Sequence, residues 1–156
     1  MNAHIRDNLN FLYGAPACRV YHNAAQSITT ATDTILDFNT ERFDNDTMHS
    51  TVSVIGRITA TTAGRYLVIT NAEFAANATG YRSLGITDAT GTTYLARETL
   101  PIVSAAATTV MNVATIYTAA AADIFHTNVY QNSGGNLNIN ATGNYSPEFM
   151  AHWMGN

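Results

Sequence analysis

The stretch Gly64-Arg65-Tyr66-Leu67-Val68-Ile69-Thr70-Asn71-Ala72-Glu73-Phe74 carries the strongest strand signal in the sequence. Aromatic and β-branched residues dominate it, and such residues are enriched in strands because they pack well on a pleated surface. Its apolar and polar residues follow a period of two, which is the periodicity of a strand. The stretch therefore predicts a strand over residues 64–74.

The same period of two runs through the chain from Ala17 onward. The triplet Ala89-Thr90-Gly91 predicts a hairpin turn with Gly91 at positive φ, and Ser133-Gly134-Gly135-Asn136 predicts a second tight hairpin connection. Eight or nine short strands separated by turn signals predict an all-β antiparallel sandwich over residues 17–156. The further strands are expected at Arg19–His22, Ile35–Phe38, Thr51–Ile58, Tyr81–Asp88, Thr92–Glu98, Val110–Tyr117, Ile124–Tyr130, Leu137–Ile139 and Glu148–Met154.

Residues 1–16 show a different pattern. Ile5, Leu9 and Leu12 fall on one stripe of a helix, Asn2 can serve as its N-cap, and Gly14 followed by Pro16 provides a stop signal. A helix this short is marginally stable alone in water. We therefore expect it to lie on a surface, which can be its own sandwich, a sister subunit or a larger assembly.

The composition excludes several classes of protein. The 156 residues contain seven Arg, no Lys and eleven acidic residues, which gives a net charge of −4 with 12% charged residues. A chain without clustered cations is a poor ligand for nucleic acid, and no apolar run is long enough to span a bilayer. The single Cys18 forms no internal disulfide and is expected to be a buried small side chain. No signal peptide is visible at the first residues.

The sequence announces no catalytic, cofactor or metal residues. The five histidines show no zinc spacing, and no nucleophile elbow is present. Asp44-Asn45-Asp46 lacks the glycine and the closing glutamate of a calcium loop, so we interpret it as a solvated turn. A weaker calcium site built from loop carbonyls stays open. Gly134-Gly135 lacks the lysine and the following helix of a phosphate cradle.

A set of aromatic, apolar and glycine residues resembles the signature of the complement C1q globular head and its tumour-necrosis-factor (TNF) relatives. The resemblance implies a TNF-like jelly-roll sandwich in which the glycine opens a turn and the tyrosine and alternate residues point inward. The segment after Ala122 is also similar to a late family strand, although that family has glycine where this chain has Ala122 and more often phenylalanine where it has Val68. The signature residues are Phe38, Phe43, Ile58, Gly64, Tyr66 and Val68.

The family resemblance also implies a homotrimer. Low charge supports this independently, because burying few ions makes association cheaper in desolvation. The aromatic residues expected either in the core or at the trimer axis are Tyr66, Tyr130, Phe149 and Trp153.

The segment Asn2–Leu12 is similar to an N-x-H-[IL]-R-D-N-L segment common in tailed-bacteriophage virion proteins. That resemblance implies an attachment arm over residues 1–16 and a location in the virion, assembled in the host cytoplasm. The implied partners are the major capsid protein or other virion proteins. The arm residues are Ile5, Arg6, Leu9, Phe11 and Leu12.

The leading hypothesis is a non-enzymatic trimeric capsid decoration protein. The alternative is a module at a tail or fibre tip that binds a receptor or a host surface glycan, using Asn and Tyr residues of the loops Asn71–Tyr81 and Gln131–Tyr145. Asparagine is equally a turn former, so this composition fits both hypotheses. A hydrolase would need a cleft with converging titratable groups, which the sequence does not reveal.

Overall fold

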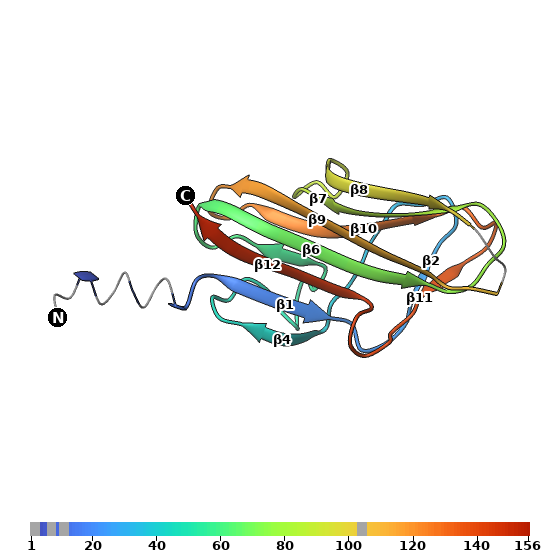
Figure 1. Cartoon of the computed structure of the whole chain (residues 1–156). Coiled ribbons are helices and arrows are strands. Elements are labelled where there is room, and N and C mark those ends of the chain that lie inside the picture. The colour runs from blue at the N-terminus through green and yellow to red at the C-terminus, as the bar shows by residue number, and fades with distance from the viewer. Residues whose placement is uncertain (1–3, 6–8, 10–12, 103–105) are drawn as a thin grey trace.

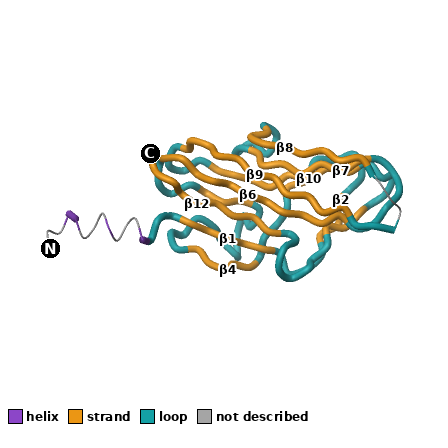
Figure 2. The backbone as a smooth tube through the Cα atoms, viewed as in Figure 1, coloured by secondary structure: helices purple, strands orange, loops and turns teal. Residues whose placement is uncertain are grey.

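A computed structural model describes residues 4, 5, 9, 13–102 and 106–156. These residues form strands and connecting loops with almost no helix (Figures 1 and 2). The strands of the described residues are β1 (Ala17–Tyr21), β2 (Gln26–Ile28), β3 (Thr34–Ile35), β4 (Thr40–Asp44), β5 (Arg57–Thr59), β6 (Gly64–Phe74), β7 (Tyr81–Thr87), β8 (Tyr94–Pro101), β9 (Thr109–Ala119), β10 (Ile124–Gln131), β11 (Leu137–Ile139) and β12 (Glu148–Gly155).

The strands form two antiparallel sheets. The large sheet has the order β2-β11-β6-β12-β1-β4, and β9 also pairs with β6. The small sheet has the order β3-β10-β7-β8, and β5 also pairs with β10. Figure 1 shows β4, β1, β12, β6 and β9 side by side along the large sheet, with the small sheet behind them. The predicted all-β antiparallel sandwich is confirmed.

The core lies between the two sheets, and β6 supplies the centre of it. Tyr66 and Val68 are fully buried, and the Tyr66 ring lies 6.0 Å from that of Phe125 on the opposite sheet. Phe38 and Phe149 form a second ring contact at 5.5 Å. Each such side chain contributes about 1.5–3 kcal/mol when it leaves water, so these contacts hold the sheets together.

A pair of buried hydroxyls connects the sheets through the core. Thr127 on β10 donates to the hydroxyl of Thr70 on β6 at 2.8 Å, and Thr70 donates to the backbone carbonyl of Glu148 on β12 at 3.1 Å. Both threonines are fully buried. Buried hydroxyls need hydrogen-bond partners. These two hydrogen bonds supply them, so the two threonines occupy core positions without a large desolvation penalty.

Most strand predictions agree with the structure, and the residue range expected for β6 matches its observed bounds. The turn before β8 also has Gly91 at φ 70°, and its N–H donates to the carbonyl of Asp88 at 2.9 Å. The expected strand Thr51–Ile58 is wrong over most of its length. Val52 is 91% exposed and Val54 has φ 51°, so this apolar run is a surface loop and only its end enters β5.

Three other expectations also need correction. Of the expected strand Ile35–Phe38, only Ile35 lies in β3, which spans Thr34–Ile35, and the strands β2 and β4 were missed. Ser133–Asn136 does not close a hairpin, because it joins β10 in the small sheet to β11 in the large sheet. These segments are short or lie at sheet edges, where the signal from periodicity is weakest.

The expected N-terminal helix is not supported by the described residues. Arg6, Phe11 and Leu12 lie outside the described part of the chain, and Ile5 and Leu9 are both exposed. Contact with the sandwich is made at Ala15 and Pro16. The Ala15 carbonyl accepts a side-chain N–H of Asn45 at 2.9 Å, and the Pro16 carbonyl accepts the N–H of Trp153 at 2.8 Å.

Over the described residues, we find no helix with the length and apolar character needed to cross a membrane.

The turn before β10 places Ala122 in the left-handed region at φ 74°. Its N–H donates to the carbonyl of Ala60 at 2.7 Å, and the carboxylate of Asp123 accepts the N–H of Ala120 at 2.8 Å. The turn thus keeps the backbone conformation that glycine adopts at no steric cost, although the residue here is alanine.

Replacing Ala122 by glycine is therefore expected to raise the free energy of unfolding by about 0.5–1 kcal/mol, measured by urea denaturation. Ala121→Gly is the matched control, because Ala121 is exposed in the same turn without a positive φ. The control should lower stability slightly. Equal effects of the two substitutions would contradict the strain at Ala122.

Candidate functional site

The most distinctive surface of the described chain is the outer face of the large sheet, on the side away from the core. Because side chains alternate along a strand, the residues between the buried positions of β6 must point outward. The same holds for β1, β9 and β12. The outer-face residues are Ala17, Arg19, Tyr21, Phe43, Arg65, Leu67, Ile69, Asn71, Val110, Asn112, Ala114, Ile116, Thr118, Met150, His152 and Met154.

The strand register aligns these residues in rows across the sheet. One row runs from Phe43 on β4 through Arg19, Met150 and Ile69 to Ala114 on β9. Directly opposed residues in antiparallel strands have Cβ atoms about 4.5–5.5 Å apart, so the members of a row contact one another. The row joins five strands into one largely apolar surface.

A second row lies one step along the strands and consists of Ala17, His152, Leu67 and Ile116. Ile116 is 59% exposed, and Val110, further along β9, is 54% exposed. A contiguous apolar patch that no part of the described chain covers is the usual mark of a protein interface.

Phe43 was expected in the core, and its position is a correction. It is 50% exposed because it lies opposite Arg19, which points outward from β1. An irregularity in the β1–β4 register between Arg19 and Val20 shifts the pairing at this point. The pattern of apolar residues alone did not reveal which face Phe43 would occupy.

Two arginines at the edge of the outer face share one carboxylate within the protomer. Glu148 is fully buried and pairs with Arg42 through Nε at 2.5 Å and with Arg19 through Nε at 2.8 Å. The Arg42 guanidinium also lies 4.4 Å from the centre of the Tyr21 ring. The shared carboxylate makes this edge less costly to cover with another protein than two unpaired cations would be, because it offsets part of their charge.

The other predicted site residues are not gathered on this face. Phe38, Ile58, Tyr66, Val68 and Phe149 are fully buried in the core. Phe149 therefore points away from the outer face, although it was a possible interface residue.

Two further aromatic residues from the expected axis set lie elsewhere. Tyr130 is on the small sheet, where its ring stacks on that of Tyr81 at 5.4 Å. Trp153 is half-buried and donates its indole N–H to the carbonyl of Ala63 at 3.0 Å. A Cβ at Gly64, which has φ 145°, would meet the Trp153 indole nitrogen at 2.3 Å. Trp153 and Gly64 thus close one end of the sandwich.

The two loops considered for glycan binding meet at the opposite end of the sandwich from Trp153. Their amide side chains mostly hold the loops together: Asn132 accepts the N–H of Tyr81 at 2.7 Å, and Asn77 accepts that of Thr79 at 2.8 Å. The fully buried Arg82 donates to the backbone carbonyls of Asn77, Thr79 and Tyr81.

Glu73 anchors the same end of the molecule. Burial raises the pKa of its carboxyl, but hydrogen bonds from Tyr145, Asn140 and Thr108 outweigh that effect and leave the pKa lowered. Tyr145 and Asn140 donate to it at 2.6 and 2.9 Å. These polar groups satisfy one another and therefore serve to shape the loops.

No group of three or more His, Cys, Asp or Glu side chains in the described chain is placed to hold a metal ion. At Asp44 the carboxylate accepts the backbone N–H groups of Asp46, Met48 and His49, which makes this segment a turn. Cys18 is fully buried, and burial raises the pKa of its thiol.

Sequence reasoning missed most of the outer face. The available signal was the alternation in β9, where Val110, Asn112, Ala114, Ile116 and Thr118 all point away from the buried residues. Apolar residues occur at both the inward-facing and the outward-facing positions of β9, so the sequence pattern does not show which face of the strand is buried.

Comparison with known proteins identifies the fold. No family model matches the chain, and no curated protein matches it by sequence. Among solved structures, the globular domain of zebrafish complement 1qA protein is 14% identical with a TM-score of 0.55, over 87% of this chain and 92% of that one. Murine APRIL is 13% identical with a TM-score of 0.60, over 89% and 98%.

The structure of Eiger TNF from S. frugiperda is similar as well, at 9% identity and a TM-score of 0.61, over 90% of this chain and 94% of that one. The chain therefore has the TNF-like jelly-roll fold of C1q and TNF-family domains, as the signature residues implied. Identities this low establish the fold alone.

An apolar outer face predicts that copies of the chain associate through it. Ile116→Arg should weaken this association at least 100-fold, which corresponds to about 2.8 kcal/mol, because the introduced charge loses its hydration without gaining a partner. Sedimentation equilibrium over a range of protein concentrations measures the effect.

Thr99→Arg is the matched control, because Thr99 is exposed on the outward side of β8 in the small sheet. Circular dichroism must show that both variants stay folded. Unchanged association of the Ile116→Arg variant would contradict the role of this face.

Proposed function

We propose that the protein is a non-enzymatic structural protein that acts as a homotrimer, with the outer face of the large sheet as the contact between copies. The single observation that carries this proposal is the pair of apolar rows across β4, β1, β12, β6 and β9. Interfaces between identical subunits are more apolar than ordinary protein surface, and this face has that character.

The charge distribution supports the same conclusion. The chain has only 12% charged residues, and Arg19 and Arg42 at the edge of the outer face share the carboxylate of Glu148. A closed ring of three copies buries such a face on every subunit and leaves no free copy of it for further growth. Assembly thus removes the apolar surface that a single chain exposes.

We further propose that the trimer decorates the capsid of a tailed bacteriophage and is attached by residues 1–16. The similarity of Asn2–Leu12 to a virion-protein segment supports this location. Residues 13–16 and the C-terminal end of β12 lie at one end of the sandwich in Figure 1. An arm at that end would contact the capsid and leave the loops of the opposite end facing outward.

The attachment proposal predicts that deletion of residues 1–14 abolishes binding to virions while the trimer stays intact. The measurement is cosedimentation of purified protein with particles that lack it, together with sedimentation equilibrium of the free protein. A second variant, in which residues 1–14 are replaced by a Gly/Ser segment of equal length, separates loss of the arm from a shorter chain. Undiminished binding by either variant would contradict the arm.

No enzymatic activity is part of the proposal. The similar solved structures are those of a complement globular domain, APRIL and a TNF protein. We also propose no cofactor and no contact with nucleic acid.

A second candidate function is binding of a receptor or host glycan at a tail or fibre tip. The observation that favours it is the position of Asn71–Tyr81 and Gln131–Tyr145 at one end, with Tyr145 44% exposed and the Tyr81–Tyr130 ring pair nearby. Aromatic rings can stack on sugar rings, and side-chain amide groups can form hydrogen bonds with sugar hydroxyls.

A glycan array probed with the intact protein tests this second function. It predicts saturable binding that Tyr145→Ala lowers at least tenfold, whereas Tyr13→Ala, at the other end of the molecule, leaves binding unchanged. The copy number per virion separates the two functions: hundreds of copies indicate the capsid, and a handful indicate the tail. No binding on the array and a high copy number would contradict the tip function.

A further inference from the structure

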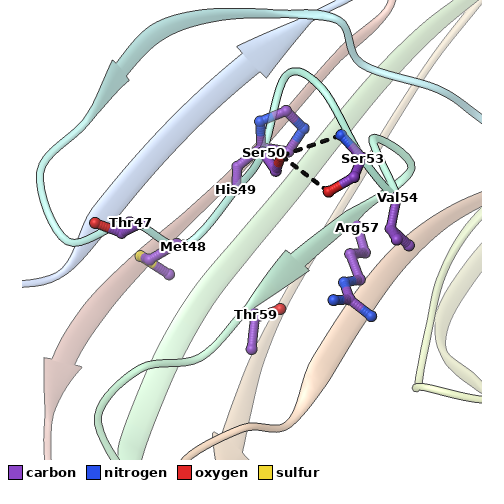
Figure 3. A pocket seen from close by; sticks show the side chains of 8 residues that line it. All are labelled: Thr47, Met48, His49, Ser50, Ser53, Val54, Arg57 and Thr59. Atoms are coloured by element: carbon purple, nitrogen blue, oxygen red, sulfur yellow. Dashed lines mark hydrogen bonds between the residues drawn. The ribbon is translucent and has the colours of Figure 1, made fainter.

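A hollow of about 180 Å³ lies between β5 and the loop that precedes it, away from the rows of the outer face. Figure 3 shows Arg57 and Thr59 on β5, with Ser50, Ser53 and Val54 on the loop. Arg57 and Thr59 share one side of β5 because Ile58 between them points into the core, where it is fully buried. The lining residues are Thr47, Met48, His49, Ser50, Ser53, Val54, Arg57 and Thr59.

Arg57 is half-buried, and its guanidinium has no ion pair, hydrogen bond or ring contact with any residue in the described part of the chain. A guanidinium carries five N–H donors and is always charged, so leaving it unpaired in a partly buried position is unfavourable. The other described arginines all have partners. Arg19 and Arg42 pair with Glu148, Arg65 donates to the carbonyl of Asn156, Arg82 donates to three backbone carbonyls, and Arg97 donates to Ser83.

Three acidic residues of the neighbouring segment 41–46 do not pair with Arg57, because each is held elsewhere. Glu41 contacts the His49 ring nitrogen Nδ1 at 3.1 Å, and Asp44 accepts three backbone N–H groups. Asp46 accepts the hydroxyl of Thr61. The lining itself contains Arg57 and four hydroxyl residues but no carboxylate. In a chain with a net charge of −4, this is a local site suited to an anion.

The loop above the hollow is also unusual in its apolar residues. Val52 and Val54 are 91% and 59% exposed, and no described residue covers them. Val54 has φ 51°, a conformation that a β-branched residue rarely adopts, and Thr47 at the other end of the loop has φ 55°. Ser50 holds the loop from within, because its hydroxyl accepts the N–H groups of Val52 and Ser53. Figure 3 shows its contact with Ser53. The backbone thus presents two valines outward at a conformational cost.

The hollow holds a cation and hydroxyl groups, and two exposed valines lie beside it. This surface is complementary to an acidic side chain that is flanked by apolar side chains. No Phe, Tyr or Trp is among the described residues that line the hollow, so it lacks the broad stacking surface that a sugar ring uses. We propose that this hollow is a docking site for a partner protein, in which a Glu or Asp carboxylate of the partner pairs with Arg57 and its apolar neighbours cover Val52 and Val54. The site is independent of the homotrimer and of the attachment arm.

The test uses the full-length protein and three probes: the peptide acetyl-Leu-Glu-Leu-amide, its neutral analogue acetyl-Leu-Gln-Leu-amide, and inorganic phosphate. Nuclear magnetic resonance of ¹⁵N-labelled protein follows the backbone amides of Ser53, Val54, Arg57 and Thr59. We expect saturable shifts at these amides with the Glu peptide and at least tenfold weaker binding of the Gln peptide. Arg57→Gln should weaken Glu-peptide binding at least tenfold, and higher salt should weaken it as well.

Arg65→Gln is the matched control, because Arg65 is an exposed arginine that donates to the carbonyl of Asn156. This variant should bind the Glu peptide as the unmodified protein does. Val52→Ser combined with Val54→Ser should weaken the Glu peptide but leave phosphate binding unaltered.

Three results would overturn the proposal. The first is equal binding of the Glu and Gln peptides, or equal binding by the Arg57→Gln variant. The second is tighter binding of phosphate than of the Glu peptide, which would make the hollow a site for small anions. The third is that the same amides shift with protein concentration when no probe is present, and that Arg57→Gln abolishes these shifts. The occupant would then be a second copy of this chain.

Discussion

The pairing of β6 is the constraint on which the rest of the structure depends. This strand pairs with β9 along its whole length, from Gly64 opposite Ala119 to Phe74 opposite Thr109, and with β12 on its other side. A strand held on both sides cannot rotate, so each of its side chains must face either the core or the outer face. Tyr66 and Val68 define the core as a result, and Leu67 and Ile69 define the outer face.

This constraint explains why the chain is apolar on both sides of its large sheet. A sheet face that meets water usually carries polar residues in alternation with buried ones. Here the residues opposite Ile69 are Met150 and Ala114, and those opposite Leu67 are His152 and Ile116. A face of this kind is typical of a protein interface, and it is the basis of the proposed association between copies.

The few charged residues serve distinct purposes in this arrangement. Glu148 pairs with two arginines at the border of the outer face, and Arg82 holds a loop through three backbone carbonyls. Arg57 does neither, and it faces a hollow without any acidic lining residue. The few charged residues are therefore unevenly arranged. The ion pairs of Glu148 lie at the border of the outer face, whereas the unpaired Arg57 lies at the hollow beside β5.

The sequence by itself determined the all-β class, the extent of β6, the turn at Gly91 and the family signature, because these depend on local periodicity and on backbone preferences of single residues. It left undecided the side occupied by Phe43 and the fate of Val52 and Val54, where apolar residues point into water. It also did not show that Ser133–Asn136 crosses between sheets. Only the tertiary structure decided these points, because register and strand order depend on contacts between residues far apart in the chain, and such contacts leave no local pattern.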